Sequence, residues 1–380
     1  MGVVPVTRRA VWKLEDLRRC VPLATRGAGQ LGYVGWIADG NMGDEAMYTA
    51  QRRALPNARF APLPTLRMMS ALRRLLPHDL VQGVLLGGGT LIGWPLFRHP
   101  LERMCAEGST PLFMLGTGVE DPGYRVRKPT HAQALRQEWG GDDDSVEREL
   151  ARWADLLSHA DAVRVRGPRS AATLESFGIS AEVTGDPALL LADDAPSSVP
   201  AEKVLGLNIG VADGVWGDRP EEIFAAVVDV GRAFSDRGWR IRFVPTWFGD
   251  VPTMRAAARE IGAAATVFED FRELESLREA LRTCRVFAGE KLHSIVLAAT
   301  VATPALALAY HPKCQDFQES LDRQEYSVRT DRLDVSDLVD RLDELERGQE
   351  QHRAAIHGAV MFRRRRLEAA ADEIGAALRC

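Results

Sequence analysis

Short apolar segments alternate with amphipathic helical segments along the whole chain. Residues 31–37 and 84–86 are such apolar segments in the first half, and residues 204–209 and 305–309 are examples in the second half. Strands that are apolar on both faces are typical of parallel sheets covered by helices on each side. Because the alternation restarts in the second half, the sequence predicts an α/β chain with two Rossmann-like, doubly wound domains facing a cleft.

The boundary between these domains is marked by a stretch rich in Asp, Ser and Pro at residues 193–200, which we interpret as a linker. We therefore expect an N-terminal domain over residues 1–195, a second domain over residues 200–335 and a charged helical tail over residues 336–380. A length of 380 residues, 46% of them hydrophobic, is ample for two cores.

Composition excludes several classes of function. A formal net charge of −5 gives no reason to expect a nucleic-acid partner. The five cysteines are scattered without a CxxC pair, so we expect neither a metal site nor a disulfide framework, and a reduced cytoplasmic setting. The acidic cluster at residues 142–144 is interpreted as a solvated loop. The longest uncharged run, residues 294–310, falls short of the ~20 apolar residues of a membrane-spanning helix.

Glycine and polar residues follow the strands of the first half. Asn41, Asp44 and Glu45 lie where a glycine-containing loop passes into a helix, and they fit either a substrate-facing loop or a capped helix start. Gly88 and Gly89 belong to a run of three glycines after a strand. Such a run lets backbone amides approach a ligand or lets elements pack closely, but it matches neither dinucleotide nor Walker patterns.

The most informative turn follows the strand-type segment 285–288. Glu290, Lys291 and His293 stand between this segment and an apolar helix that begins behind a serine. Helix N-termini at the carboxyl ends of strands bind anions in open α/β sheets. From the residue type alone, a histidine at a helix start is either a capping or packing residue or a proton donor.

Taken in chain order, the motifs at these strand ends resemble those of the polysaccharide pyruvyl transferase family. The matching segments are residues 32–35 with 40–46, 86–91, 115–118, 166–170 with 184–188, 291–293 and 310–313. The resemblance extends from about residue 31 to residue 313. The chain departs from the usual family pattern at Lys291, where arginine is usual, and at Gly167, where an acidic residue is usual.

The resemblance implies a fold similar to that of B-type glycosyltransferases and a defined reaction. The enolpyruvyl group of phosphoenolpyruvate would be transferred onto two hydroxyls of a sugar, forming a pyruvate ketal and releasing phosphate, in polysaccharide or glycolipid biosynthesis. Phosphoenolpyruvate is the donor substrate, and no cofactor is implied.

The resemblance also assigns roles to residues. Arg166, Lys291 and Leu292 would bind the donor, and Lys313, at the end of another strand, is a further cation for it. His293 would be the general acid. By analogy with B-type glycosyltransferases, the N-terminal domain would bind the acceptor. Its candidate residues are Asn41, Asp44, Glu45, Gly88 and Gly89.

The implied chemistry requires an acid that protonates the methylene carbon of the donor, a task that suits histidine near neutral pH. The N-terminal end of a helix disfavours the imidazolium form of His293. A bound dianion, or Glu290 turned inward, would favour it. We therefore expect His293 to become a competent acid mainly once the donor is bound.

Two other readings remain open. A B-type glycosyltransferase that uses a nucleotide sugar would need a glutamate for the ribose, and Glu290 or Glu269 could serve. A non-catalytic glycan-binding relative is the other alternative. Four arginines at residues 363–366 fit either contact with a lipid-linked sugar phosphate at the inner face of the membrane or a solvated helix face.

Overall fold

The first half of the chain is built on a four-stranded parallel sheet. The computed structural model describes residues 30–37, 40–63, 81–105, 110–124, 146–210 and 215–378; the acidic cluster at 142–144 lies outside these ranges. The strand order is β2-β1-β3-β5, and all three neighbouring pairs are parallel. The strands are β1 (Gln30–Val34), β2 (Arg59–Pro62), β3 (Gly83–Leu86) and β5 (Leu112–Met114).

The second half contains a six-stranded sheet, also parallel throughout, in the order β11-β10-β9-β12-β13-β14. Its strands are β9 (Val204–Asn208), β10 (Arg240–Phe243), β11 (Ala265–Val267), β12 (Val286–Gly289), β13 (Ala305–Ala309) and β14 (Ser327–Arg329). This is the order of a doubly wound dinucleotide-type sheet, in which the winding direction reverses between β9 and β12. The predicted α/β class with parallel sheets is confirmed.

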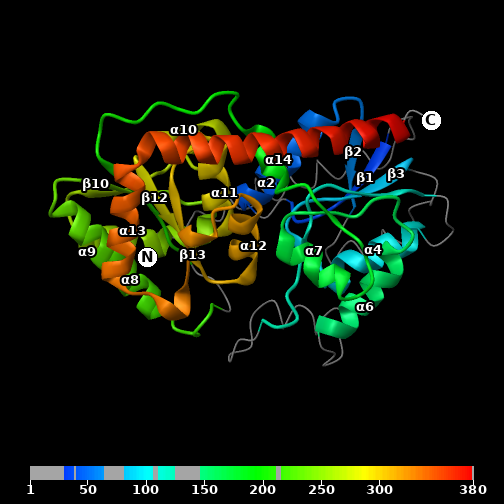
Figure 1. Cartoon of the computed structure of the whole chain (residues 1–380), viewed down its shortest axis with the longest axis horizontal. Helices are drawn as coiled ribbons and strands as arrows, with labels where there is room; N and C mark the ends of the chain where they lie inside the picture. The colour runs from blue at the N-terminus through cyan, green and yellow to red at the C-terminus, as the bar shows by residue number, and fades with distance from the viewer. Residues whose placement is uncertain are drawn as a thin grey trace, which may run out of the picture.

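Helices cover both sheets, and Figure 1 shows the two halves side by side. Those of the first half are α2 (Met42–Ala54), α4 (Pro95–Cys105), α6 (Val146–Leu157) and α7 (Pro168–Glu175). Those of the second half include α8 (Pro220–Ser235), α9 (Val251–Ile261), α10 (Leu274–Arg282), α11 (Leu292–Thr300) and α12 (Pro312–Ser320).

Shorter elements complete the first half. Two small parallel pairs join β4 (Thr90–Ile92) to β6 (Gly118–Val119) and β7 (Arg164–Val165) to β8 (Glu182–Val183). A 3₁₀ helix, η4 (Pro187–Leu191), follows β8 and packs against both α2 and α11. Further 3₁₀ turns are η5 (Phe248–Asp250), η6 (Gln324–Tyr326) and η7 (Thr330–Arg332).

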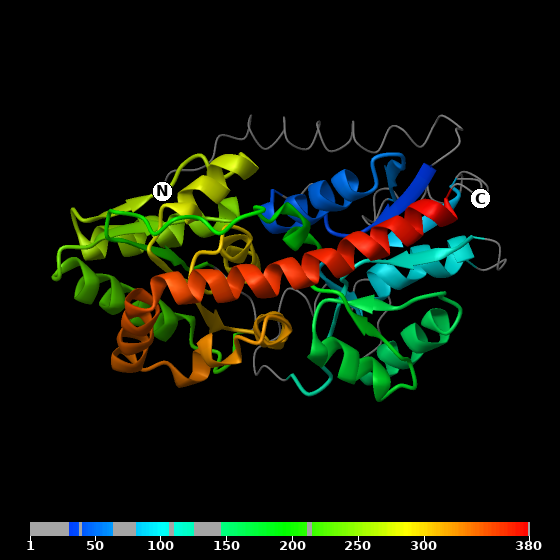
Figure 2. The same cartoon turned by 45° about the horizontal axis from the view of Figure 1, so that its top comes forward.

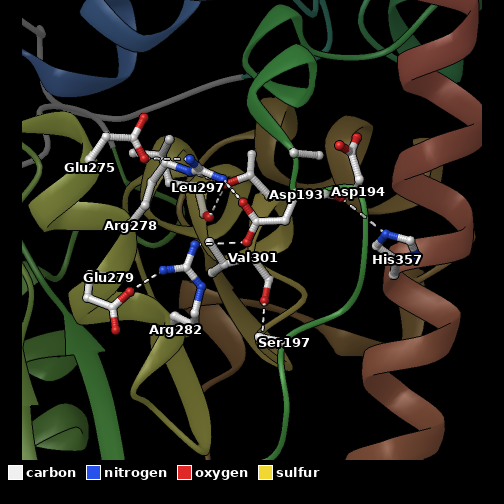
Figure 3. Close-up of polar contacts among 12 residues, drawn as sticks. Asp193, Asp194, Ser197, Glu275, Arg278, Glu279, Arg282, Leu297, Val301 and His357 are labelled. Carbon is white, nitrogen blue, oxygen red and sulfur yellow. Dashed lines mark hydrogen bonds and ion pairs between the residues drawn. The ribbon is translucent and has the colours of Figure 1, made fainter.

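The segment between η4 and β9 crosses from one half to the other and is held by α10. Asp193 pairs with Arg278 and Arg282 of α10, as Figure 3 shows, and its backbone carbonyl contacts His357. Ser197 donates to the carbonyl oxygen of Val301 at 2.7 Å. The predicted linker therefore has no helix or strand of its own, but its path is fixed by ion pairs and hydrogen bonds.

The charged tail forms two helices that join at Gly348. The first, α13 (Val335–Arg347), packs on the second sheet, whereas α14 (Gln349–Ala377) runs back along the first half and packs against η4 and α2. Figures 1 and 2 both show α14 as a long red helix that crosses the two halves.

Three of the four arginines at residues 363–366 bind the protein itself. Arg363 donates to the carbonyl oxygen of Val183 at 3.0 Å, and Arg366 pairs with Glu182 at 2.7 Å. Arg364 pairs with Asp194 at 2.8 Å. Within the described ranges, every helix is too short or too polar to cross a lipid bilayer.

Candidate active site

The turn after β12 lies at the point where the second sheet reverses its strand order. β12 ends at Gly289, and α11 begins at Leu292 after Glu290 and Lys291. A Cβ at Gly289 would lie 2.2 Å from Ser294 Oγ, so glycine is needed where the helix turns back this closely. Open α/β sheets bind ligands at such switch points, beyond the carboxyl ends of the strands.

Asn208, the last residue of β9, holds this turn in place. Its backbone oxygen accepts the N–H of Glu290 at 3.0 Å, and its Oδ1 accepts the N–H of Lys291 at 3.0 Å. Its Nδ2 donates to the carbonyl oxygen of Val244 at 2.9 Å. Because Asn208 is fully buried, these bonds are shielded from water and fix the turn before any ligand binds.

The carboxyl ends of the two sheets meet at this place. The N–H of Met42, the first residue of α2, donates to the carbonyl oxygen of Thr246 at 2.8 Å, and Asn41 forms an antiparallel bridge with Trp247. Further from the turn, His311 Nε2 lies 3.7 Å from Glu120 Oε2. Groups of the first half can therefore act on a ligand held at the second sheet.

His293 stands at this junction, in the first turn of α11. Its ring packs on the backbone of α2, because a Cβ at Gly43 would lie only 2.0 Å from His293 Cγ and Nδ1. Its Nε2 lies 3.8 Å from Asp186 Oδ2, and both atoms are buried without a hydrogen-bond partner in the part of the chain that the structure describes. The side chain of His293 is 11% exposed and that of Asp186 is 0% exposed.

Burial determines the charge of this pair. Burial, together with the nearby cations Lys313 and Arg166, lowers the pKa of His293 to about 3. Burial also raises the pKa of Asp186 to about 6, although Arg166 opposes the rise. Burial and these cations therefore leave the imidazole neutral at neutral pH before a donor binds.

Glu290 does not turn toward His293. Its Oε2 accepts the N–H of Gly210 at 2.7 Å, and burial raises the pKa of its carboxyl to about 7. The carboxylate that faces His293 is that of Asp186 instead. Glu269, the other glutamate considered for a ribose, forms an exposed ion pair with Arg255 at 2.9 Å.

Two lysines lie near the ring of Tyr310. Lys291 Nζ is 5.9 Å from the ring centroid and 3.6 Å from Asp250 Oδ1, and Lys313 Nζ is 4.7 Å from the same centroid. Burial, with a contribution from the neighbouring Lys291, lowers the pKa of Lys313. No carboxylate among the described residues forms an ion pair with Lys313, which makes its charge the one most available to an anion.

Arg166 is fully buried and already paired. Its guanidinium lies 3.2 Å from Asp316 Oδ2, which also accepts the hydroxyl of Ser170 at 2.7 Å. The other oxygen of Asp316 accepts backbone N–H groups at the start of α7. A Cβ at Gly167 would lie 2.2 Å from Asp316 Oδ1, so the carboxylate fills the space beside Gly167. Arg166 thus contributes to the field at His293 while its own charge is balanced by Asp316.

Leu292 contributes to the site through its backbone. The residue is buried, and its side chain belongs to the hydrophobic core. The first N–H groups of a helix have no acceptor within the helix and carry the positive end of its dipole. The amides of Leu292 and His293, the first residues of α11, are therefore suited to an anionic group.

The candidate residues for acceptor binding have different roles in the structure. Asn41 caps α2 by accepting the N–H of Gly43 at 3.1 Å, and Glu45 is partly exposed one residue beyond the buried Asp44. Gly88 is a packing position, because a Cβ there would lie 2.2 Å from Met47 Sδ. Gly89 has a φ of 99°, and the Cβ position there lies 3.8 Å from Asp44 Oδ1. The structure thus brings Asp44 next to the glycine turn.

Sequence reasoning missed two buried carboxylates, those of Asp250 and Asp316, and it interpreted the buried Asp186 only as a residue that caps or closes a loop. Asp186 precedes a proline, which is typical of a residue that only closes a turn. Asp316 lies in the middle of a helix. Their partners are distant in sequence, so spacing carries no signal for them.

Comparisons with known proteins identify the fold and the family. The UDP-N-acetylglucosamine 2-epimerase of Neisseria meningitidis is similar with a TM-score of 0.54 and 10% identity, over 92% of this chain and 99% of that one. A UDP-glucosyltransferase from Polygonum tinctorium gives 0.53 and 11%, over 94% and 100%. The wall teichoic acid polymerase TagF gives 0.51 and 11%, over 98% and 97%. At these identities the likeness establishes the fold, that of B-type glycosyltransferases and epimerases.

No curated protein sequence matches the chain. A family model described as polysaccharide pyruvyl transferase matches residues 41–312, which is well over half of the sequence. The matched region includes Arg166, Lys291 and His293, and it ends directly before Lys313. The chain belongs to the polysaccharide pyruvyl transferase family.

Proposed function

We propose that the protein transfers the enolpyruvyl group of phosphoenolpyruvate onto two hydroxyls of a sugar and forms a pyruvate ketal. The observation that carries the proposal is the position of His293, at a helix N-terminus on the switch point of the second sheet, with Lys291 in the same turn and Lys313 nearby. The donor carries a carboxylate and a phosphate, which such a site suits.

Donor recognition would use backbone amides and cations together. The first amides of α11 and the ammonium of Lys313 favour a dianion. Lys291, which lies beside Asp250, is a second cation in the same region. A bound dianion also raises the pKa of His293, because an opposite charge stabilises the imidazolium. Binding of the donor would therefore also favour the protonated form of His293 that the reaction requires.

The reaction needs one acid and one base. His293 gives a proton to the methylene carbon while a sugar hydroxyl attacks the adjacent carbon; the bond from that carbon to the phosphate oxygen breaks, and the second hydroxyl adds. One proton enters the methyl group, two leave the hydroxyls and one departs with hydrogen phosphate, so charge and atoms balance. Asp44, buried beside Gly89, is our candidate for the base.

The acceptor would enter from the first half. The family supports a polysaccharide or one of its precursors as the acceptor. The solved structures of similar fold include enzymes whose names specify UDP-sugars, so a nucleotide-sugar donor is the alternative that an experiment must separate. Both glutamates considered for a ribose contact are engaged by the protein's own groups.

The test is phosphate release from phosphoenolpyruvate across a panel of sugar diols, with thermal-shift measurements against phosphoenolpyruvate and UDP-sugars in parallel. We expect stabilisation by phosphoenolpyruvate and phosphate release with at least one acceptor. The His293→Ala variant should bind the donor but lose about 10²- to 10⁴-fold in rate, the usual contribution of a general acid.

The matched control is His99→Ala, because His99 lies on α4 with its side chain 48% exposed. It should keep the wild-type rate. Stabilisation by UDP-sugars alone, or a His293→Ala enzyme with a normal rate, would reject the proposed donor or the proposed acid, respectively.

A further inference from the structure

Asp186 and His293 present an unusual pair of atoms to each other. Asp186 Oδ2 and His293 Nε2 are both buried, both lack a hydrogen-bond partner among the described residues, and lie 3.8 Å apart. A buried polar atom without a partner destabilises a fold, so native proteins rarely keep one without a functional reason. Here two such atoms face one another from different halves of the chain.

The position of the Asp186 carboxylate is set by its other oxygen. Oδ1 accepts the N–H of Ala188 at 3.0 Å. The turn before it is held by α14, because a Cβ at Gly185 would lie 2.9 Å from Arg363 Cβ, and Arg363 donates to the carbonyl oxygen of Val183. One oxygen is thus occupied by the backbone, and the free oxygen stays directed at the imidazole.

The two nitrogens of His293 have different surroundings. Nε2 is buried and faces Asp186. Nδ1 lies on the side of the ring that packs beside Gly43 of α2, and it is the nitrogen that remains for the donor. The charged groups around the ring are Asp186 from the turn before η4, Lys313 from α12 and Arg166 from the end of β7. At the ring, α2 contributes the uncharged Gly43. Asp186 is therefore the one negative group among these that can stabilise an imidazolium.

We propose that Asp186 is the positioning residue for His293: it accepts the Nε2 proton and so keeps Nδ1 free to take and deliver the proton that reaches the donor. The inference rests on the proposed function, because it assigns His293 the role of acid. A separation of 3.8 Å is longer than a hydrogen bond, and catalytic contacts of this kind commonly shorten when substrate binds.

The Asp186→Asn variant tests the proposal. The asparagine keeps an oxygen for the N–H of Ala188 and replaces the free carboxylate oxygen with an NH₂ group. Two N–H donors cannot face each other, so the imidazole should move its proton to Nδ1 and accept the amide at Nε2. This is the wrong tautomer for the proposed acid.

The direct readout is the tautomer of His293 in ¹⁵N-histidine-labelled full-length protein at pH 7.5, with and without phosphoenolpyruvate. The His293 signals are identified by their loss in His293→Gln. Asp186, whose pKa burial raises to about 6, is ionised at this pH. We expect the Nε2–H form in the wild type and the Nδ1–H form in Asp186→Asn.

The kinetic readout separates positioning from structure. In Asp186→Asn the kcat should fall about 10²-fold or more, as a wrong tautomer does in other histidine enzymes, with the KM for phosphoenolpyruvate changed less than threefold. Asp334→Asn is the control, because exposed Asp334 also caps a helix by accepting a backbone N–H. It should change neither readout.

Asp186→Ser provides a second route if the asparagine variant does not fold, because serine retains the cap and removes the carboxylate; its kcat should fall as well. An unchanged tautomer and an unchanged kcat in these variants would show that Asp186 only caps η4. If the wild type releases no phosphate with any acceptor, the proposed function fails, whereas the tautomer of the donor-free protein still decides the present inference.

Discussion

Replacing Gly43 with alanine tests the packing of His293 on α2 without any assumption about substrate. The new Cβ would lie 2.0 Å from His293 Cγ and Nδ1, whereas real Cβ contacts stay above 3.0 Å. The ring or the helix start must therefore move by at least the difference, about 1 Å. A displacement of this size at a reacting group lowers rates by about 10²-fold.

The effect on stability combines two opposing contributions. Overpacking destabilises a core by about 1–3 kcal/mol. Alanine in place of a helical glycine stabilises by up to about 1 kcal/mol. We therefore expect Gly43→Ala to lower the free energy of unfolding by about 0–2 kcal/mol and the transfer rate by about 10²-fold. Urea unfolding with an unchanged m value is the stability assay.

A double-mutant cycle isolates the contact. The partner change is His293→Gly, because an alanine at 293 would keep a Cβ 2.4 Å from the new methyl group. In the His293→Gly background, Gly43→Ala should be stabilising by about 0.5–1 kcal/mol, the helix preference alone. Gly358→Ala in α14 is the matched control, because no described residue outside the neighbouring helical backbone has a heavy atom within 4 Å of the new Cβ; it should show the same gain in both backgrounds. The reasoning is refuted if Gly43→Ala has equal effects with and without the imidazole.

Three further predictions concern the groups around this contact. Gly167→Ala places a Cβ 2.2 Å from Asp316 Oδ1 and should destabilise the protein by about 1–3 kcal/mol in urea unfolding; a neutral result would mean that the carboxylate can move freely. Lys313→Met should raise the KM for phosphoenolpyruvate about tenfold or more, while the exposed Lys203→Met leaves it unchanged; equal KM values would remove Lys313 from the donor site. Because burial lowers the pKa of His293 to about 3, the unfolded chain binds this proton below pH ~6.5 and the folded chain does not, so stability is lost as the pH falls from ~6.5 toward 3. His293→Gln should remove about 1–2 kcal/mol of the loss between pH 7 and pH 5 in urea unfolding, and parallel pH curves for the two proteins would contradict the burial argument.

Much of the fold can be predicted from local sequence patterns, and there is a physical reason why some strands were missed. Strands β9 and β13 are continuous apolar runs, and their positions agree with the prediction. The sheet-edge strands β2 and β14 were missed because they are short and contain proline or charged residues, as strands with only one neighbour tolerate.

The candidate site was predictable where a strand end alone identifies a group. Lys291 and His293 directly follow a strand, and the carboxyl ends of parallel strands share one edge of a sheet. The role inferred for Asp186 could not be read in this way, because its free oxygen meets His293 only when the two halves pack together. The same holds for Asp316, which balances Arg166 from a helix 150 residues away in the sequence.

Transfer in deuterated water tests the central claim most directly. If His293 delivers a solvent-derived proton to the methylene carbon, mass spectrometry of the ketal formed from phosphoenolpyruvate and a sugar diol should show one deuterium in the methyl group, with one phosphate released per ketal. The His293→Ala enzyme should form almost none of this product. A ketal without deuterium, or equal yields from the two enzymes, would contradict the account.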